Sequence, residues 1–317
     1  MRLLTLALCA TVACGLLCGC GGNVPAATYG DTAPARAVEP RSGIYVAQFD
    51  GTDILGYRAA HEALEGPICK VRGGTYVNGI AVDGRGNLID PNGSTKYVIV
   101  FKGPNMCGEK LGSFRDPYGQ PSDASSGDAA TGKIAVANIA DNGSSPGSLA
   151  ICTLRAGCTS NLTNPELYAA EGVAMGNGDC WVDAKRTAAG GAALIYFKGC
   201  AGQGEAANGF KSSSPGGIDV DNHGNLVIVD QRHLMVYVYS GCNPDCTVVG
   251  GPFPLKSECF FGKLNAANTN YVTVDQLDGN IDFYSYSTDA IKFEYAVKGL
   301  PVSLAPEGIA QNPRSAQ

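Results

Sequence analysis

The sequence has few charged residues and few histidines. Only 16% of its 317 residues are Asp, Glu, Lys or Arg, and it contains 3 His and 1 Trp. The net charge is −6 and no basic stripe is present, which argues against nucleic-acid binding. Runs rich in Ala, Leu, Glu and Lys, which favour helices, are missing outside the N-terminus.

Several motifs of catalysis and cofactor binding are also missing. The glycine clusters lie between expected strands and never open a helix, so there is no P-loop and no dinucleotide fingerprint. No Gly-x-Ser-x-Gly surrounds Ser122, which leaves serine hydrolysis unsupported. The three His and the lack of Cys-x-x-Cys pairs argue against a zinc site. His223, in the turn "DNHGN", is interpreted as a solvated turn residue.

What the chain does contain is glycine and short strands. It has 43 Gly, and many short segments rich in Val, Ile and Tyr are separated by Gly, Asn, Asp and Pro. This pattern is typical of an all-β protein.

The N-terminus predicts export. "MRLLTLALCATVACGLLCGC" has one Arg and an apolar stretch too short to span a membrane, as in a secretory signal. Its end resembles a bacterial lipoprotein box, which predicts a signal peptide over residues 1–19 and a lipid on Cys20. Residues 20–42 predict a flexible tether, so the chain would be anchored to the cell envelope facing the periplasm or the outside. The alternative is a secreted protein cleaved nearby by ordinary signal peptidase.

The cysteines agree with export. After loss of residues 1–19 and lipidation of Cys20, nine thiols remain, which predicts disulfides with one Cys unpaired. "CNPDC" favours a Cys242–Cys246 bridge within a turn, and Cys180 and Cys200 flank a predicted hairpin that a disulfide would close.

One unit recurs along the chain. Its first strand is found as "NGIAVD", "SDASSG", "EGVAMG", "GGIDVD", "NYVTVD" and "EGIAQN". The second residues of these segments, from residue 79 to residue 308, are spaced by 44, 49, 45, 54 and 37 residues. Such spacing is typical of four-stranded propeller blades. We predict six blades, with seven as the alternative if the longest interval hides a degenerate unit.

The two ends of the chain complete each other. The last unit stops after its first strand, whereas residues 42–58 look like a second and third strand without a first. A blade shared by both ends would close residues 43–317 into a single ring and remove its open sheet edge.

The repeated Gly-Ile-Ala-Val-Asp, turn and Gly-Asn-Leu resemble the NHL-repeat propellers, most clearly near residues 79 and 217. WD40 repeats are disfavoured because the single Trp, Trp181, lacks the context of that motif. The resemblance implies a fold and leaves the function open.

In a propeller the inner strands line a central channel, so their first residues gather at one mouth. These residues are expected to be Asn78, Ser122, Glu171, Gly216, Asn270 and Glu307. All except Gly216 are candidate ligand-binding residues, and their oxygen atoms suit a hard cation such as calcium. This likeness to gluconolactonase-type propellers implies a metal site at Glu171, Glu307, Asn78 and Asn270. The alternative is that these polar residues only form turns.

The recurring Asp residues are interpreted as structural, because a turn needs a capping carboxylate in every blade and a catalytic pair is needed once. The sequence therefore favours a membrane-anchored binding module for a protein, a glycan or a small molecule. The alternative is a metal-dependent hydrolase or lyase of the gluconolactonase or streptogramin-lyase kind.

Overall fold

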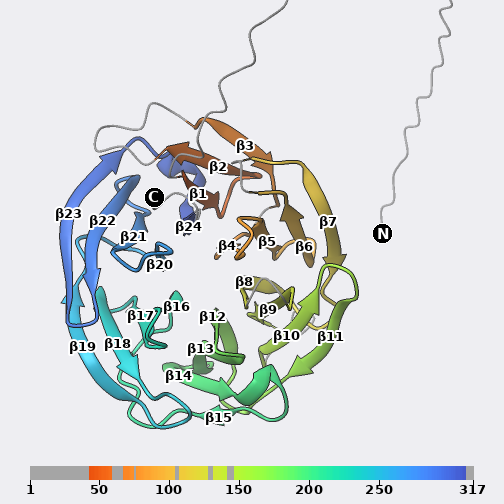
Figure 1. The fold of residues 1–317 in the computed structure, drawn as a ribbon, viewed down its shortest axis with the longest axis vertical. Coiled ribbons are helices and arrows are strands. Elements are labelled where there is room, and N and C mark those ends of the chain that lie inside the picture. The colour runs from red at the N-terminus through yellow and green to blue at the C-terminus, as the bar shows by residue number, and fades with distance from the viewer. Residues whose placement is uncertain are drawn as a thin grey trace, which may run out of the picture. The chain divides into compact units, whose positions relative to one another are not determined.

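The computed structural model describes residues 43–58, 67–74, 76–103, 107–127, 131–140 and 146–311. These residues form 24 β-strands and two short 3-10 helices. The strands build six four-stranded antiparallel sheets, which surround a central axis like the blades of a wheel (Figure 1). The prediction of a six-bladed β-propeller is confirmed, and the seven-bladed alternative is wrong. The predicted signal peptide, Cys20 and the tether lie outside the described residues.

The blades follow one another along the chain, and the four strands of a blade are named from the innermost to the outermost. Blade I comprises β24 (Pro306–Gln311), β1 (Gly43–Gln48), β2 (Asp53–Arg58) and β3 (Cys69–Arg72). Blade II comprises β4 (Ala81–Val82), β5 (Leu88–Asn92), β6 (Tyr97–Phe101) and β7 (Lys110–Arg115). Blade III comprises β8 (Pro121–Ser126), β9 (Lys133–Asn138), β10 (Ser148–Thr153) and β11 (Gly157–Leu162).

The second half of the wheel has the same order. Blade IV comprises β12 (Ala169–Gly176), β13 (Asp179–Thr187), β14 (Gly190–Phe197) and β15 (Glu205–Ala206), with η1 (Lys198–Cys200) between the last two. Blade V comprises β16 (Ile218–Val220), β17 (Leu226–Asp230), β18 (Met235–Ser240) and β19 (Thr247–Pro254). Blade VI comprises β20 (Gly262–Leu264), β21 (Asn270–Asp275), β22 (Asn280–Ser287) and β23 (Ala290–Lys298), and η2 (Val302–Leu304) follows it.

Blade I closes the ring as predicted. Its inner strand β24 comes from the C-terminal end of the described chain and pairs with β1, with Tyr45 opposite Ala310 and Val46 opposite Ile309. Backbone hydrogen bonds between the two chain ends therefore close the wheel, and blade I has four strands like the other five.

Blade VI corrects one prediction. The segment at residues 270–275 is β21, the second strand, and the inner strand is β20. The pattern missed β20 because it is three residues long and has Lys263 where most other inner strands have Ile or Val. With Gly262 in the fifth place the spacings become 44, 49, 45, 45 and 46 residues, so the repeat is more regular than it first looked.

Hydrophobic faces of neighbouring blades pack on each other. One cluster joins Leu149 of blade III to Val182 and Phe197 of blade IV, all fully buried. Near the axis the blades come closest, and a Cβ on Gly172 would collide with the backbone carbonyl of Gly216 in the next blade. Glycine at this position lets the inner strands approach one another.

Most of the recurring Asp residues hold turns, as predicted. The Asp83 carboxylate accepts the backbone N–H groups of Arg85 and Asn87, and Asp221 repeats this arrangement in blade V. Asp90 does not follow the rule. Its side chain is fully buried, neither oxygen has a hydrogen-bond partner among the described residues, and burial raises its pKa to about 7.

Eight of the nine predicted thiols form four disulfides. Cys180–Cys200 and Cys242–Cys246 occur as predicted, and the others are Cys69–Cys107 and Cys152–Cys158. Cys259 is the buried free thiol among the described residues. Four disulfides indicate an oxidising compartment outside the cytoplasm. In the described part of the chain, no helix has the length and apolar character that crossing a bilayer requires.

Candidate functional site

The six inner strands run in the same direction along the central channel, so all of them begin at one mouth and end at the other. We call the mouth where these strands begin the start mouth and the other the end mouth. The start mouth holds a cavity of about 340 Å³. Three of the predicted residues, Asn78, Glu171 and Glu307, line it together. The sequence therefore identified these three as neighbours although they are far apart along the chain.

Glu171 already has partners in this cavity. Its carboxylate lies 2.9 Å from Lys185 Nζ and accepts a long hydrogen bond of 3.5 Å from Gln231 Nε2. Burial raises the pKa of Glu171, and the hydrogen bond and charge of Lys185 partly offset this. The sequence analysis did not find Lys185 or Gln231, because they lie on or after β13 and β17 and reach the mouth from second strands.

Glu307 has no such neutralisation. The residue is 7% exposed, and among the described residues its carboxylate has no hydrogen-bond or ion-pair partner. Burial first, and then the nearby charges of Glu171 and Asp50, raise its pKa to about 8. A buried carboxyl group without a partner is costly, and such groups are concentrated at functional sites.

The rest of the cavity wall is mostly aromatic and amide, with Ile139 and Ala305 as small apolar additions. Phe49, Phe260 and Phe261 line it, together with the side chain of Gln276. Because Glu171 is paired with Lys185, Glu307 in its charged form is the carboxylate that can attract a cation, with the ring faces as a second source of attraction. The oxygen atoms of Asn78 and the Gln side chains can also accept hydrogen bonds.

Two predicted residues lie elsewhere. Ser122 is buried and its hydroxyl donates to the backbone carbonyl of Ala170 at 2.8 Å, so it links blade III to blade IV. Asn270 starts β21 and its backbone N–H donates to Asn265 Oδ1 at a turn. Neither residue lines the start-mouth cavity.

Inside the channel, Asp123 occupies the position that is glycine in the other five inner strands. It is fully buried, accepts the Val173 N–H at 3.0 Å and lies 3.8 Å from Lys263 Nζ. Burial raises the pKa of Asp123 to about 6, and the charge of Lys263 opposes the rise. A carboxylate of blade III thus reaches an ammonium of blade VI across the axis.

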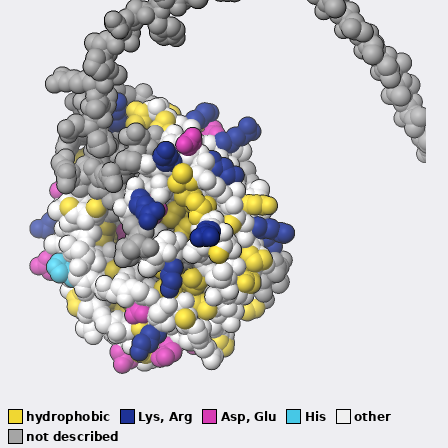
Figure 2. All heavy atoms as spheres, turned by 45° about the vertical axis from the view of Figure 1, so that its right-hand side comes forward, with side chains coloured by type: hydrophobic (Ala, Val, Ile, Leu, Met, Phe, Trp, Pro, Cys, Tyr) yellow, Lys and Arg dark blue, Asp and Glu magenta, His cyan; other side chains and the backbone are white. Residues whose placement is uncertain are grey.

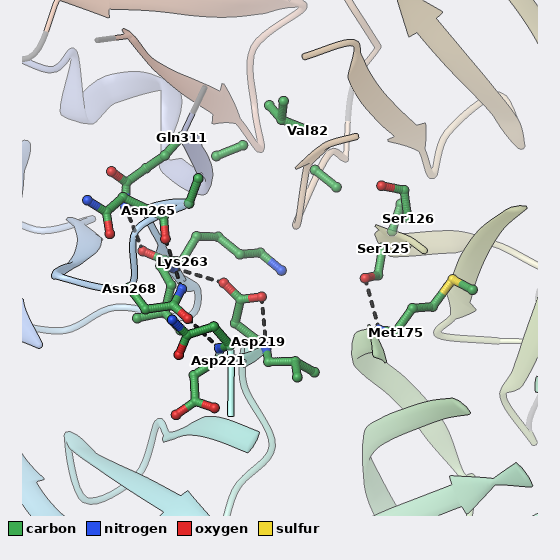
Figure 3. A pocket seen from close by; sticks show the side chains of 17 residues that line it. Val82, Ser125, Ser126, Met175, Asp219, Asp221, Lys263, Asn265, Asn268 and Gln311 are labelled. Atoms are coloured by element: carbon green, nitrogen blue, oxygen red, sulfur yellow. Dashed lines mark hydrogen bonds between the residues drawn. The ribbon is translucent and has the colours of Figure 1, made fainter. Parts of the chain in front are cut away.

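The end mouth holds a second cavity, of about 350 Å³ (Figure 3). Lys263 and Asp219 lie on one side, and Ser125, Ser126 and Met175 lie on the other. Most of its polar groups are already used, because Asp219 accepts the backbone N–H of Leu264 and Asp221 caps its turn. This mouth therefore offers fewer free groups than the start mouth.

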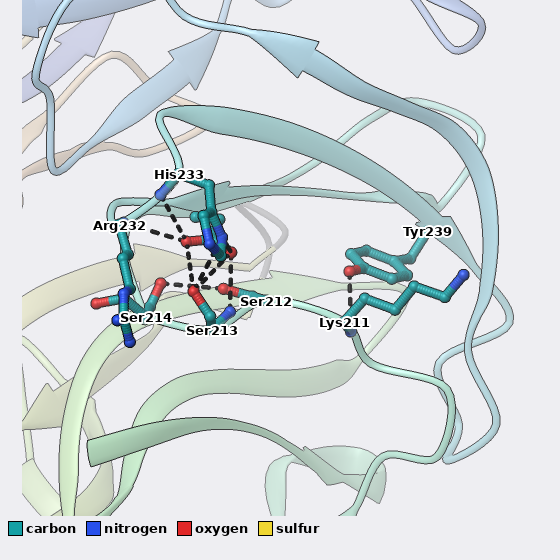
Figure 4. A network of polar contacts seen from close by, with 8 residues as sticks. Lys211, Ser212, Ser213, Ser214, Arg232, His233 and Tyr239 are labelled. Atoms are coloured by element: carbon teal, nitrogen blue, oxygen red, sulfur yellow. Dashed lines mark hydrogen bonds and ion pairs between the residues drawn. The ribbon is translucent and has the colours of Figure 1, made fainter. Parts of the chain in front are cut away.

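Blade V contains a Ser, a His and an Asp in contact (Figure 4). Ser213 Oγ and Asp230 Oδ2 each lie 3.1 Å from the same atom, His233 Nδ1. A catalytic triad requires the two nitrogens of the ring to serve Asp and Ser separately. Asp230 also accepts the N–H groups of Arg232 and His233. These hydrogen bonds stabilise the β17–β18 turn, and their geometry is not that of a catalytic triad.

One group of three potential metal ligands occurs among the described residues, namely Asp116, Cys152 and Cys158. The two sulfur atoms are joined in a disulfide, which leaves no thiolate to bind a metal.

The comparisons support the fold alone. No protein-family profile matches the sequence, and no curated protein matches it. A chain of a nidogen/laminin complex is similar in structure, with a TM-score of 0.66 and 12% identity over 86% of this chain and 98% of that one. A protein of unknown function from Bacteroides caccae has a TM-score of 0.61 and 11% identity over 86% and 98% of the two chains. A Lactobacillus plantarum protein has a TM-score of 0.55 and 9% identity over 86% and 99%.

Proposed function

We propose that the chain is an exported, lipid-anchored, NHL-like β-propeller that binds a positively charged ligand in the start-mouth cavity. The lipid would be attached to Cys20, and the tether would hold the wheel near the membrane. Glu307 is the observation that supports the proposal: a carboxylate 7% exposed, with no partner among the described residues, faces a cavity large enough for a small molecule.

The cavity favours an organic ammonium compound. Glu307 would bind the ammonium group, and Glu171 would remain paired with Lys185. Phe49, Phe260 and Phe261 supply apolar contact and ring faces for the carbon skeleton. Binding at Glu307 would stabilise its charged form and release a proton near neutral pH, since its pKa is raised to about 8.

Calorimetry of the purified protein with a panel of primary and quaternary alkylammonium compounds tests the proposal. We expect saturable binding that is weakened at least tenfold in Glu307→Gln. Glu205→Gln, an exposed carboxylate on β15, is the matched control and should bind like wild type. A panel without any binder, or equal losses in both variants, would reject a cationic ligand here.

A metal-dependent hydrolase or lyase is the second candidate, because the donor set of this cavity is rich in oxygen. Calcium would be bound by side-chain oxygen atoms of Glu307, Glu171, Asn78 and the two Gln residues. Lys185, which is paired with Glu171, would compete with calcium for that carboxylate. Bound calcium would polarise a carbonyl or acidify water. Calcium should then raise the melting temperature of wild type but not of Glu171→Ala/Glu307→Ala, and lactone hydrolysis should depend on it. Equal shifts, or none, would remove this candidate.

A further inference from the structure

Basic residues of blades II and III gather on one face of the wheel. Their inner strands end at the end mouth, so the turns after β4, β6, β8 and β10 all lie on that face. These turns and the adjoining strand ends carry five exposed basic residues: Arg85, Lys102, Lys110, Lys133 and Arg155. No basic stripe is visible in the sequence because these residues are spread over about 70 positions.

Few acidic side chains balance them. Among the described residues from 83 to 158, Glu109 is the single exposed acidic residue, and it lies 3.6 Å from Lys102. Asp90, Asp116 and Asp123 in the same blades are buried. Asp83, which is partly exposed, lines the same cleft as Arg85 and Lys133, so the described part of this face carries five basic side chains against two acidic ones, in a chain whose net charge is −6.

Two exposed leucines lie among these basic residues. Leu111 on β7 is 44% exposed and Leu154 in the β10–β11 turn is 37% exposed. They line a cleft of about 150 Å³ between blades II and III, and Arg85 and Lys133 line it too. Figure 2 brings the side of β7 forward and shows hydrophobic side chains with Lys and Arg around them. We call these seven residues, the five basic ones and the two leucines, the basic apolar patch.

Strand β1 also begins at this face. Strand β1 begins at Gly43 next to Ile44, which pairs with Gln311, and Gln311 lines the end-mouth cavity. The segment that would carry a lipid on Cys20 is therefore continuous with a strand that begins at the end face.

We propose that the basic apolar patch docks on an anionic membrane surface. This rests on the proposed export and anchoring of the chain. Lys and Arg bind lipid headgroups while their aliphatic stems and the two leucines contact the boundary of the acyl chains. Each basic residue strengthens adsorption to an anionic surface about fivefold. The docked wheel turns its start mouth, with Glu307, away from the membrane and towards diffusing ligands.

Vesicle sedimentation tests the docking without the lipid. The mature chain carrying Cys20→Ser is mixed with vesicles of phosphatidylcholine alone or with a third of phosphatidylglycerol. We expect pelleting with the anionic vesicles only, and its loss at high salt, because the attraction is electrostatic. Lys110→Glu/Arg155→Glu should weaken partitioning at least thirtyfold, and Leu154→Ser should weaken it without changing the salt dependence.

Arg115→Glu/Lys298→Glu is the matched control. It makes the same charge change at the ends of β7 and β23, which lie on the opposite face. The control should pellet like the parent, and circular dichroism checks that both variants fold. No pelleting with anionic vesicles, equal loss in both pairs, or tighter binding to an acidic polypeptide than to the vesicles would overturn the proposal. Lipidation of Cys20, measured by mass spectrometry of the wild type, tests the anchor separately.

Discussion

Glu307→Gln should change how stability depends on pH. The pKa of Glu307 is about 8 in the folded protein and 4.5 for an unperturbed carboxyl. Between these values the folded state holds a proton that the unfolded state has released, so the free energy of unfolding falls as the pH rises through this window. The Gln side chain binds no proton, and the variant should lose this part of the pH dependence.

The size of the effect follows from the pKa difference. About 3.5 units at 1.36 kcal/mol each give an upper limit of about 5 kcal/mol. Water entry and small movements reduce such values, so we expect the variant to be about 2–4 kcal/mol more stable than wild type at pH 8.5. At pH 4 the two proteins should be equally stable, because Glu307 is then protonated in both states. Asp90 and the other buried carboxyls titrate in both proteins, so their contributions cancel, except for that of Glu171, whose charge interacts with Glu307.

Urea unfolding with intact disulfides measures this difference, and EDTA keeps calcium away from the cavity. The single Trp, Trp181, is 7% exposed and reports unfolding through its fluorescence. Wild type and variant are compared at pH 4, 6 and 8.5. A constant difference at all three values, or a less stable variant at pH 8.5, would show that Glu307 is not a buried carboxyl with a raised pKa.

Three further predictions concern stability. Asp90→Val should raise the free energy of unfolding at pH 8.5 by about 1–3 kcal/mol, because it removes a fully buried carboxylate without a partner. Urea titration checks this, and destabilisation would refute it. Asp123→Asn should cost about 1–3 kcal/mol, because it removes one of the two carboxylates near Lys263, the other being Asp219. Lys263→Met in that background should recover part of the loss by removing the buried ammonium. Additive effects in the double-mutant cycle would contradict coupling across the channel. Cys180→Ser/Cys200→Ser should cost about 3 kcal/mol in thermal unfolding, as expected for the loop it closes, and an unchanged melting temperature would refute this.

The repeat was readable because its turn chemistry recurs. Asp83 and Asp221 accept backbone N–H groups in the same way, and each is followed within its turn by a Gly that takes a positive φ, Gly86 and Gly224. Such local rules act within a few residues, so they are visible in the sequence. The inner strand around Lys263 was missed for the same reason. Lys263 is buried close to Asp123, which is far away in the sequence, and no local pattern could indicate a buried lysine in an inner strand.

At the start mouth, prediction succeeded where inner-strand order was enough. Asn78 lies just before an inner strand, and Glu171 and Glu307 lie near the beginnings of theirs, so the three meet at one end of the channel. Lys185 and Gln231 reach the same cavity from other strands, and their direction depends on the twist of the blades.

By itself the sequence indicated the all-β class, a repeat of six blades with seven as the alternative, the closure of the ring by both chain ends, and two of the four disulfides, Cys180–Cys200 and Cys242–Cys246. These features follow from turn residues, strand alternation and spacing, which are local properties. Tertiary structure alone decided the environment of each polar group. Whether Glu307 lacks a partner, whether Asp123 meets Lys263, and whether Arg85 and Arg155 share one face depend on which distant blades the closed wheel brings together, since burial and charge are set by all neighbours in space.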